Sequence, residues 1–179
     1  MTKVYTSAVV LIPPEKIWDP IQEVREKYDR NFHRWMPHIT LLYPFRPVKE
    51  YSNLERDFKQ ICSYLSSFDI ILEHFEYFHH RKNNYTIWLN PEPKIAILNL
   101  QKKIQRISPD CNDVSLHKGG FVPHLSLGQI KGKEKLLEII KQLQSHWKPL
   151  KFKVKNLFFI SRENYKYSKF HIKKVIPLA

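Results

Sequence analysis

Hydrophobic and polar positions follow two different spacings along this chain. Runs of mostly apolar or β-branched residues, bounded by proline or polar clusters, predict strands at Val4–Ile12, His38–Tyr43, Phe68–Phe78, Tyr85–Leu89, His124–Gly128, Phe152–Ile160 and Phe170–Ile176. Apolar residues three and four positions apart predict amphipathic helices at Glu15–Tyr28, Leu54–Leu65, Ile95–Ile107 and Lys133–His146. The mixed order, with the last two strands placed to pair as a hairpin, favours an α+β fold with largely antiparallel sheets.

Length and punctuation favour one domain. The chain has 179 residues and 4 glycines, and no Gly/Ser linker divides it, so we expect residues 1–179 to form a single domain. The apolar run near the N-terminus is about six residues long, whereas a membrane span needs roughly 18. Cys62 and Cys111, the two cysteines, lie far apart in sequence and suit neither a zinc site nor a disulfide framework. We therefore expect an intracellular, cytoplasmic or nuclear protein, and a monomer.

One short pattern occurs twice. Pro37–Leu41 reads PHITL and Pro123–Leu127 reads PHLSL, each of them proline, histidine, an aliphatic residue, a hydroxyl residue and leucine. A bare H-x-[ST] tripeptide is expected by chance in a chain with nine histidines, but the flanking proline and leucine match in the same frame. Each copy opens a predicted strand between helical segments, which indicates a duplicated unit with one copy in each of two lobes.

The alternation of side chains along a strand gives the pattern a chemical meaning. His38 and Thr40 share one face of their strand, and His124 and Ser126 share one face of theirs, roughly 6–7 Å apart along the chain. Two imidazoles near neutral pKa can act as general base and general acid. Hydroxyls beside them can stabilise charge on phosphate oxygens. If the lobes face each other, the four side chains suit phosphodiester chemistry without a metal; otherwise the two histidines are packed residues bonded to backbone carbonyls.

The chain is similar to the two-histidine (2H) phosphoesterases, the superfamily of 2′-5′ RNA ligase-like proteins and RNA cyclic phosphodiesterases. The resemblance rests on RWMPHITLLYPF and FVPHLSLGQI, together with the closing KFHIKKVIPL, and covers essentially the whole chain. It implies a bilobal α+β fold with a pseudo-twofold axis, an active cleft between the lobes, no cofactor and no metal. It also implies that His38, Thr40, His124 and Ser126 are the catalytic residues.

Four further residues are candidates for substrate binding. Lys118 and Phe121 lie in HKGGF, where the lysine could meet a phosphate and the ring could stack on a base, or the segment could be an ordinary turn with Phe121 in the core. Arg162 and Tyr167 lie in SRENYKY, whose mixture of basic and aromatic residues suits single-stranded nucleic acid and suits a solvated turn equally well. His33, Arg34 and Trp35, ahead of the first motif, could line the entrance of the cleft, although Trp35 is interpreted as a core residue.

Charge favours a phosphate-rich partner. Thirty Lys and Arg stand against 17 Asp and Glu, a formal net charge of +13. The leading hypothesis is a metal-independent phosphodiesterase that acts on RNA ends or nucleotides with 2′,3′-cyclic phosphate or 2′-5′ linkages. The alternative is a non-catalytic module that binds 2′- or cyclic-phosphate RNA ends. We expect RNA or a small nucleotide as partner, no membrane and no obligate protein partner.

Overall fold

The computed structural model describes residues 2–116 and 119–179 of the chain. Its strands are β1 (Ser7–Leu11), β2 (Ile39–Leu42), β3 (Phe68–His80), β4 (Asn84–Glu92), β5 (Leu125–Lys131), β6 (Leu150–Val154), β7 (Asn156–Ser161) and β8 (His171–Pro177). Its helices are α1 (Trp18–Tyr28), α2 (Tyr51–Cys62), α3 (Lys94–Gln105) and α4 (Lys133–His146). Short 3-10 turns, η1 (Glu15–Ile17), η2 (Val48–Glu50) and η3 (Asp113–Ser115), complete the chain.

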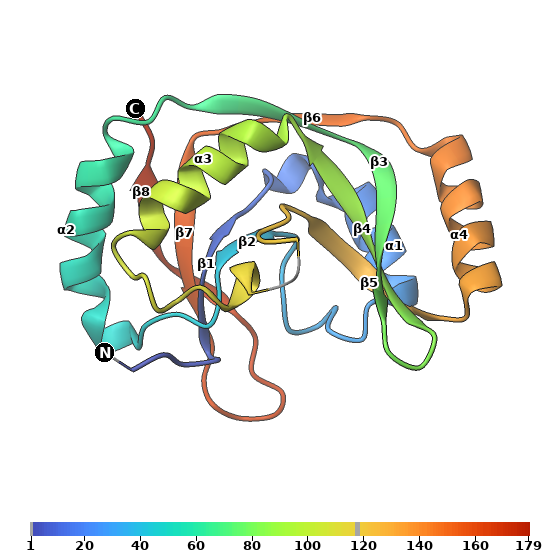
Figure 1. Ribbon diagram of the computed structural model, residues 1–179, viewed down its shortest axis with the longest axis horizontal. Coiled ribbons are helices and arrows are strands. Elements are labelled where there is room, and N and C mark those ends of the chain that lie inside the picture. The colour runs from blue at the N-terminus through green and yellow to red at the C-terminus, as the bar shows by residue number, and fades with distance from the viewer. Residues whose placement is uncertain (1, 117–118) are drawn as a thin grey trace.

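All eight strands join one curled sheet in the order β6-β3-β4-β5-β2-β1-β7-β8 (Figure 1), and each neighbouring pair is antiparallel. The two motif strands, β2 and β5, occupy the centre and meet through the single register pair Ile39–Leu125. This order confirms the expected α+β fold. The sheets of the two lobes are halves of one continuous sheet, because β2 and β5 pair with each other.

The two halves of the chain have the same order of strands and helices, and the first helix of each half packs on the other half. In the first half β1 precedes α1, then β2 and α2; in the second half β4 precedes α3, then β5 and α4. Helix α1 packs on β5, and α3 packs on β2, so the first helix of each repeat covers the motif strand of the other. Each motif strand is therefore held by residues from both copies of the repeat.

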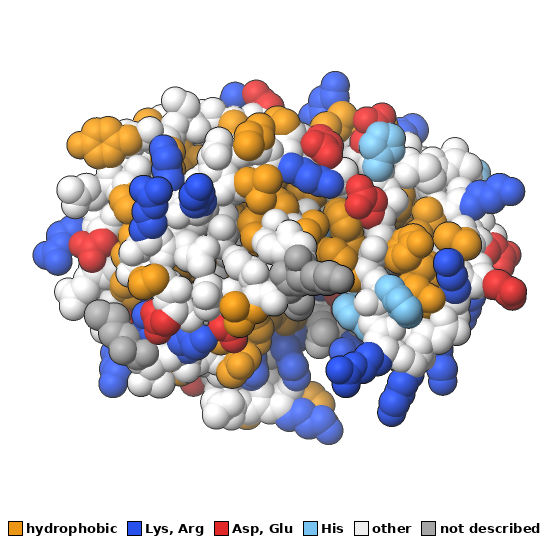
Figure 2. Space-filling model, in the orientation of Figure 1, with side chains coloured by type: hydrophobic (Ala, Val, Ile, Leu, Met, Phe, Trp, Pro, Cys, Tyr) orange, Lys and Arg blue, Asp and Glu red, His pale blue; other side chains and the backbone are white. Residues whose placement is uncertain are grey.

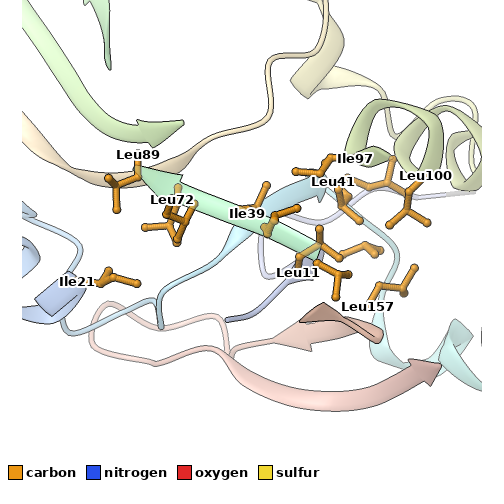
Figure 3. Packing of buried hydrophobic residues seen from close by; sticks show 14 of the residues in the cluster. Leu11, Ile21, Ile39, Leu41, Leu72, Leu89, Ile97, Leu100 and Leu157 are labelled. Atoms are coloured by element: carbon orange, nitrogen blue, oxygen red, sulfur yellow. The ribbon is translucent and has the colours of Figure 1, made fainter. Parts of the chain in front are cut away.

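The core explains why aliphatic and polar side chains alternate along the motif strand β2. Ile39 and Leu41 are fully buried in the main cluster, where Leu41 lies beside Ile97 of α3 (Figure 3). Thr40, between them, points to the opposite face and is half-buried. Burying the aliphatic side of β2 under a helix thus leaves the hydroxyl side of the strand on the face where chemistry can occur.

Helix α1 approaches β5 at a glycine. A Cβ placed on Gly128 would lie 2.5 Å from backbone atoms of Tyr28, the last residue of α1. The absence of a side chain at Gly128 therefore allows the end of α1 to contact the strand that carries the second motif.

One predicted strand was wrong. The run Phe152–Ile160 is not a single strand: β6 ends at Val154 and β7 begins at Asn156. These strands pair with β3 and β1, at opposite ends of the sheet order. The break has a signal in the sequence: Phe152 and Val154 alternate with lysines, and the consecutive polar residues Lys155 and Asn156 then shift the buried positions to Leu157 and Phe159. The predicted closing hairpin, now β7 with β8, is confirmed.

No helix in the described part of the chain is long and apolar enough to cross a membrane.

Candidate active site

The register between β2 and β5 brings the two motifs together. The pairing of Ile39 with Leu125 is antiparallel, so His38 lies toward Ser126, and Thr40 lies toward His124, on the neighbouring strand. Each imidazole is thus beside the hydroxyl of the other copy of the motif. Strands β2 and β5 begin at the residue after each histidine, so both rings stand where the strand opens.

The two imidazoles are held in the same way. Nδ1 of His38 lies 2.7 Å from the carbonyl oxygen of Met36, and Nδ1 of His124 lies 2.7 Å from the carbonyl oxygen of Val122. A carbonyl only accepts, so each Nδ1 carries the hydrogen, and the lone pair of the neutral ring is on Nε2. The distances and the two-residue offsets are equal, so both rings are anchored to the backbone in the same way.

Aromatic side chains surround the two rings unequally. His38 stacks on Trp35, with centroids 4.6 Å apart and an interplanar angle of 15°, and Trp35 stacks in turn on Phe170 at 3.7 Å. His124 instead meets the edges of Phe78, at 4.9 Å, and Trp88, at 5.9 Å. The duplicated motif is therefore symmetric in its hydrogen bonds and asymmetric in its packing.

A buried arginine fixes the segment that carries Trp35. Arg25 of α1 is 2% exposed; its Nη2 donates to the carbonyl oxygen of Trp35 at 2.9 Å and to a carboxylate oxygen of Asp29 at 2.8 Å. Its Nε also donates to Asp29, at 3.0 Å, and its Nη1 donates to Gln22, at 2.8 Å. Arg25 thereby ties α1 to the tryptophan on which His38 rests.

The surroundings keep His38 neutral. Burial, helped by the positive charge of Arg25 and the neighbouring His124, lowers the pKa of His38 to about 4, although the hydrogen bond to Met36 acts in the opposite direction. At neutral pH the ring therefore has its lone pair on Nε2 and can accept a proton.

The family model described as the 2′-5′ RNA ligase superfamily matches residues 13–166, which include both motifs and both central strands. The chain belongs to this superfamily. The resemblance of the chain to the two-histidine phosphoesterase superfamily is therefore confirmed.

Relatives and solved structures agree with this assignment. "Putative phosphoesterase GK0864" of Geobacillus kaustophilus is 26% identical over 141 residues, which span 76% of each chain. The fold is similar to that of TT0787 of Thermus thermophilus, with a TM-score of 0.65 at 16% identity over 96% of this chain and 97% of the other. It is also similar to E. coli LigT complexed with 3′-AMP, with a TM-score of 0.64 at 15% identity over 97% and 98%. The chain thus has the LigT-like fold, and phosphoesterase is the activity class of its superfamily.

Three of the four substrate-binding candidates lie in the described part of this superfamily member. Phe121 is half-buried and packs against the main core. Arg162 donates to the carbonyl oxygens of Glu163, at 3.0 Å, and Tyr165, at 3.4 Å, and its guanidinium lies 5.7 Å from the centre of the Phe170 ring. Arg162 therefore shapes its own loop. Tyr167, on the same loop, is 78% exposed and lines a groove described below, and Lys118 lies outside the described residues.

Sequence reasoning assigned no site role to Arg25 or Trp88, and it preferred the core to the cleft entrance for Trp35. Trp35 was interpreted as core, and it does pack on the smaller apolar cluster around Val10, but it also stacks on His38. Arg25 lies in an otherwise amphipathic helix, where an arginine normally faces water, so the sequence carries no signal of its burial.

Within residues 2–116 and 119–179, no three His, Cys, Asp or Glu side chains are grouped as a metal site would require.

Proposed function

We propose that the chain is a metal-independent phosphodiesterase that acts on RNA ends or nucleotides with a 2′,3′-cyclic phosphate or a 2′-5′ linkage. The observation that carries the proposal is the Ile39–Leu125 register, which brings both histidines and both hydroxyls into one site. The matched Nδ1 hydrogen bonds, which a packed histidine can also make, leave Nε2 as the atom for proton transfer in both rings. Membership of the 2′-5′ RNA ligase superfamily and the LigT-like fold support the same reaction class.

The proposed step is a displacement at phosphorus. His38 takes a proton from the attacking water as its oxygen bonds to phosphorus, and protonated His124 donates a proton to the departing ribose oxygen as the P–O bond breaks. The lowered pKa of His38 suits the base, because that ring is unprotonated at neutral pH. A positive charge on His124 also disfavours a second one on His38, so the two rings are not protonated together at neutral pH.

Thr40 and Ser126 are proposed to donate hydrogen bonds to the non-bridging phosphate oxygens. Each hydroxyl lies toward the histidine of the other motif, so a phosphate placed between the rings can meet both. Hydrogen bonds to a charged oxygen are shorter and stronger than neutral ones, and they stabilise the transition state as negative charge builds on the phosphate oxygens.

The test is turnover in excess chelator of a short RNA ending in a 2′,3′-cyclic phosphate and of 2′-5′-linked oligoadenylate, with products resolved by mass. His38→Ala and His124→Ala should each reduce kcat by about 100-fold or more, as expected for loss of a general base or acid. His74→Ala is the matched control, because His74 is exposed on β3 and bonds only weakly to its neighbour Glu73. Activity that survives either motif substitution would refute the mechanism.

A pH profile separates the two roles. With His38 as base, the acidic limb of kcat/KM lies closer to pH 4 than to the ordinary histidine value near 6.5. An acidic limb that remains in the residual activity of His38→Ala and disappears in His124→Ala would reverse the assignment of base and acid.

A further inference from the structure

Two loops that are distant in sequence form a groove beside the candidate active site. One follows α1 and includes residues 29–35; the other joins β7 to β8 and includes residues 162–170. Both extend from the lower edge of the molecule in Figure 1. Phe170 N donates to the carbonyl oxygen of Arg34, and Nη2 of Arg34 donates to the carbonyl oxygen of Lys166, both at 2.9 Å. These bonds hold the loops around a hollow of about 430 Å³.

The groove is strongly basic. Its described lining includes the four cationic side chains Arg30, Arg34, Lys166 and Lys169 and no acidic side chain. Arg30, Lys166 and Lys169 are exposed, and they are therefore accessible to a ligand. Figure 2 shows Lys and Arg side chains along much of the lower edge of this face. Four positive charges in one hollow favour a ligand with more than one negative charge.

The two carboxylates on these loops leave the charge of the groove in place. Asp29 begins the first loop, but it accepts two bonds from buried Arg25 and is 6% exposed on its side chain. Glu163 of the second loop is exposed and is not part of the lining. The charge of the groove is therefore not neutralised from within, and an anion that enters would replace water and counterions only.

The walls of the groove continue directly into the site. Trp35 follows Arg34, and Phe170 follows Lys169; these two rings stack on each other, and Trp35 stacks on His38. The backbone amide of Arg30 also donates to Gln129 on β5, the strand of the second motif, at 3.3 Å. Because Phe170 is buried and Trp35 is partly exposed, a chain whose end lies between the histidines can continue past Trp35 into the groove.

We infer that this groove is a subsite for the phosphodiester backbone of single-stranded RNA whose terminal phosphate occupies the His38–His124 site. The inference rests on the proposed function for the position of the reacting end. Arg30, Lys166 and Lys169 contact phosphates of the preceding nucleotides, and the exposed ring of Tyr167 offers a surface on which a base can stack. The preferred substrate is then an oligonucleotide, and a mononucleotide uses only part of the site.

The test compares two triple variants with the same change in charge. Arg30→Ala/Lys166→Ala/Lys169→Ala removes three cations from the groove, and Lys102→Ala/Lys103→Ala/Lys135→Ala removes three exposed lysines from α3 and α4. Arg34 is left in place because it bonds the loops together. The substrates are adenosine 2′,3′-cyclic phosphate and a six-nucleotide RNA with the same terminus, each over a range of salt concentrations.

We expect the native chain to have the higher kcat/KM on the RNA. The groove variant should lower the ratio of RNA to mononucleotide kcat/KM about ten-fold or more, mainly through KM, and the control variant should leave that ratio within about two-fold. The negative slope of log affinity against log salt should become shallower by about 2 in the groove variant, because each phosphate contact on a single strand contributes ~0.7 to its magnitude. Equal loss on both substrates, or equal effects of the two variants, would overturn the inference.

Binding separates this inference from the proposed function. RNA affinity is also measured by fluorescence anisotropy in the His38→Ala background, where turnover plays no part. If the native chain turns over neither substrate, yet removal of the three groove cations weakens RNA binding and removal of the three control lysines does not, the proposed function fails and the groove stands. If polyglutamate of equal charge competes as well as RNA, the groove is a general polyanion site and the assignment to RNA is wrong.

Discussion

The most informative single perturbation is removal of the charge on Arg25. Arg25→Met retains an apolar stem of similar length and removes every bond that the guanidinium makes to Asp29, Gln22 and the carbonyl of Trp35. The carboxylate of Asp29, 6% exposed, would then be buried without its partner. Breaking a buried ion pair by removing one partner costs roughly 3–5 kcal/mol, a large part of the ~5–15 kcal/mol that stabilises a typical domain.

The expected result is a fall of roughly 6–20 °C in Tm, since each kcal/mol shifts Tm by about 2–4 °C in a chain of this size. The control is Arg56→Met, whose side chain is 79% exposed and lies 3.5 Å from Asp57; an exposed pair contributes at most about 1 kcal/mol. Free energies of unfolding from urea titrations, with the native chain alongside, measure both effects.

A double-mutant cycle identifies the cause. Asp29→Asn keeps the side-chain oxygen that accepts from the amide of Asn31, at 2.9 Å, but removes the charge. Arg25→Met/Asp29→Asn should therefore be more stable than the sum of the two single losses predicts, by about 2 kcal/mol or more. A cost below about 1 kcal/mol for Arg25→Met, or additive losses, would refute the view that a buried charge pair holds the segment under His38.

Three further expectations follow from other contacts. Because burial lowers the pKa of His38 to about 4, the unfolded chain binds a proton between pH 6.5 and 4 that the folded chain does not, so stability falls across this interval as pH decreases and is unaffected by this group above it. Urea titrations at several pH values measure this fall in the free energy of unfolding, which is at most about 3 kcal/mol because the ring is only half-buried. His38→Asn should remove it. Gly128→Ala should destabilise by about 1–3 kcal/mol, because its Cβ meets the backbone of Tyr28, whereas Gly119→Ala, with open space around it, is the control. Phe159→Ala, which removes a fully buried ring in contact with Phe58, should cost roughly 3–5 kcal/mol by the same assay.

The sequence was sufficient for the features that repeat. The helix Lys133–His146 begins and ends where periodicity placed it, and the hairpin of β3 and β4 joins the two strands predicted around its basic turn. The family assignment followed from two copies of one pentapeptide, because a duplicated motif is visible without a structure.

Features that depend on partners distant in sequence could not be read in advance. The pairing of Ile39 with Leu125 places each histidine beside the hydroxyl of the other motif. This register is set by the whole curled sheet, so the sequence near either motif does not indicate it. Nothing in the sequence around Arg25 indicates that its side chain is buried. The basic groove is formed by residues of two loops that come together only in the folded chain. Local patterns encode elements, whereas side-chain neighbourhoods depend on tertiary contacts.

The exchange of α1 and α3 between the halves makes the two copies of the repeat depend on each other. A single copy would leave its motif strand without the helix of the other copy that packs on it, so two copies are needed to close one core. The two copies nevertheless give their histidines different surroundings, because His38 stacks on Trp35 whereas His124 contacts Phe78 edge-on. One chain with two unequal copies can therefore give its two imidazoles different properties while both stand in the same site.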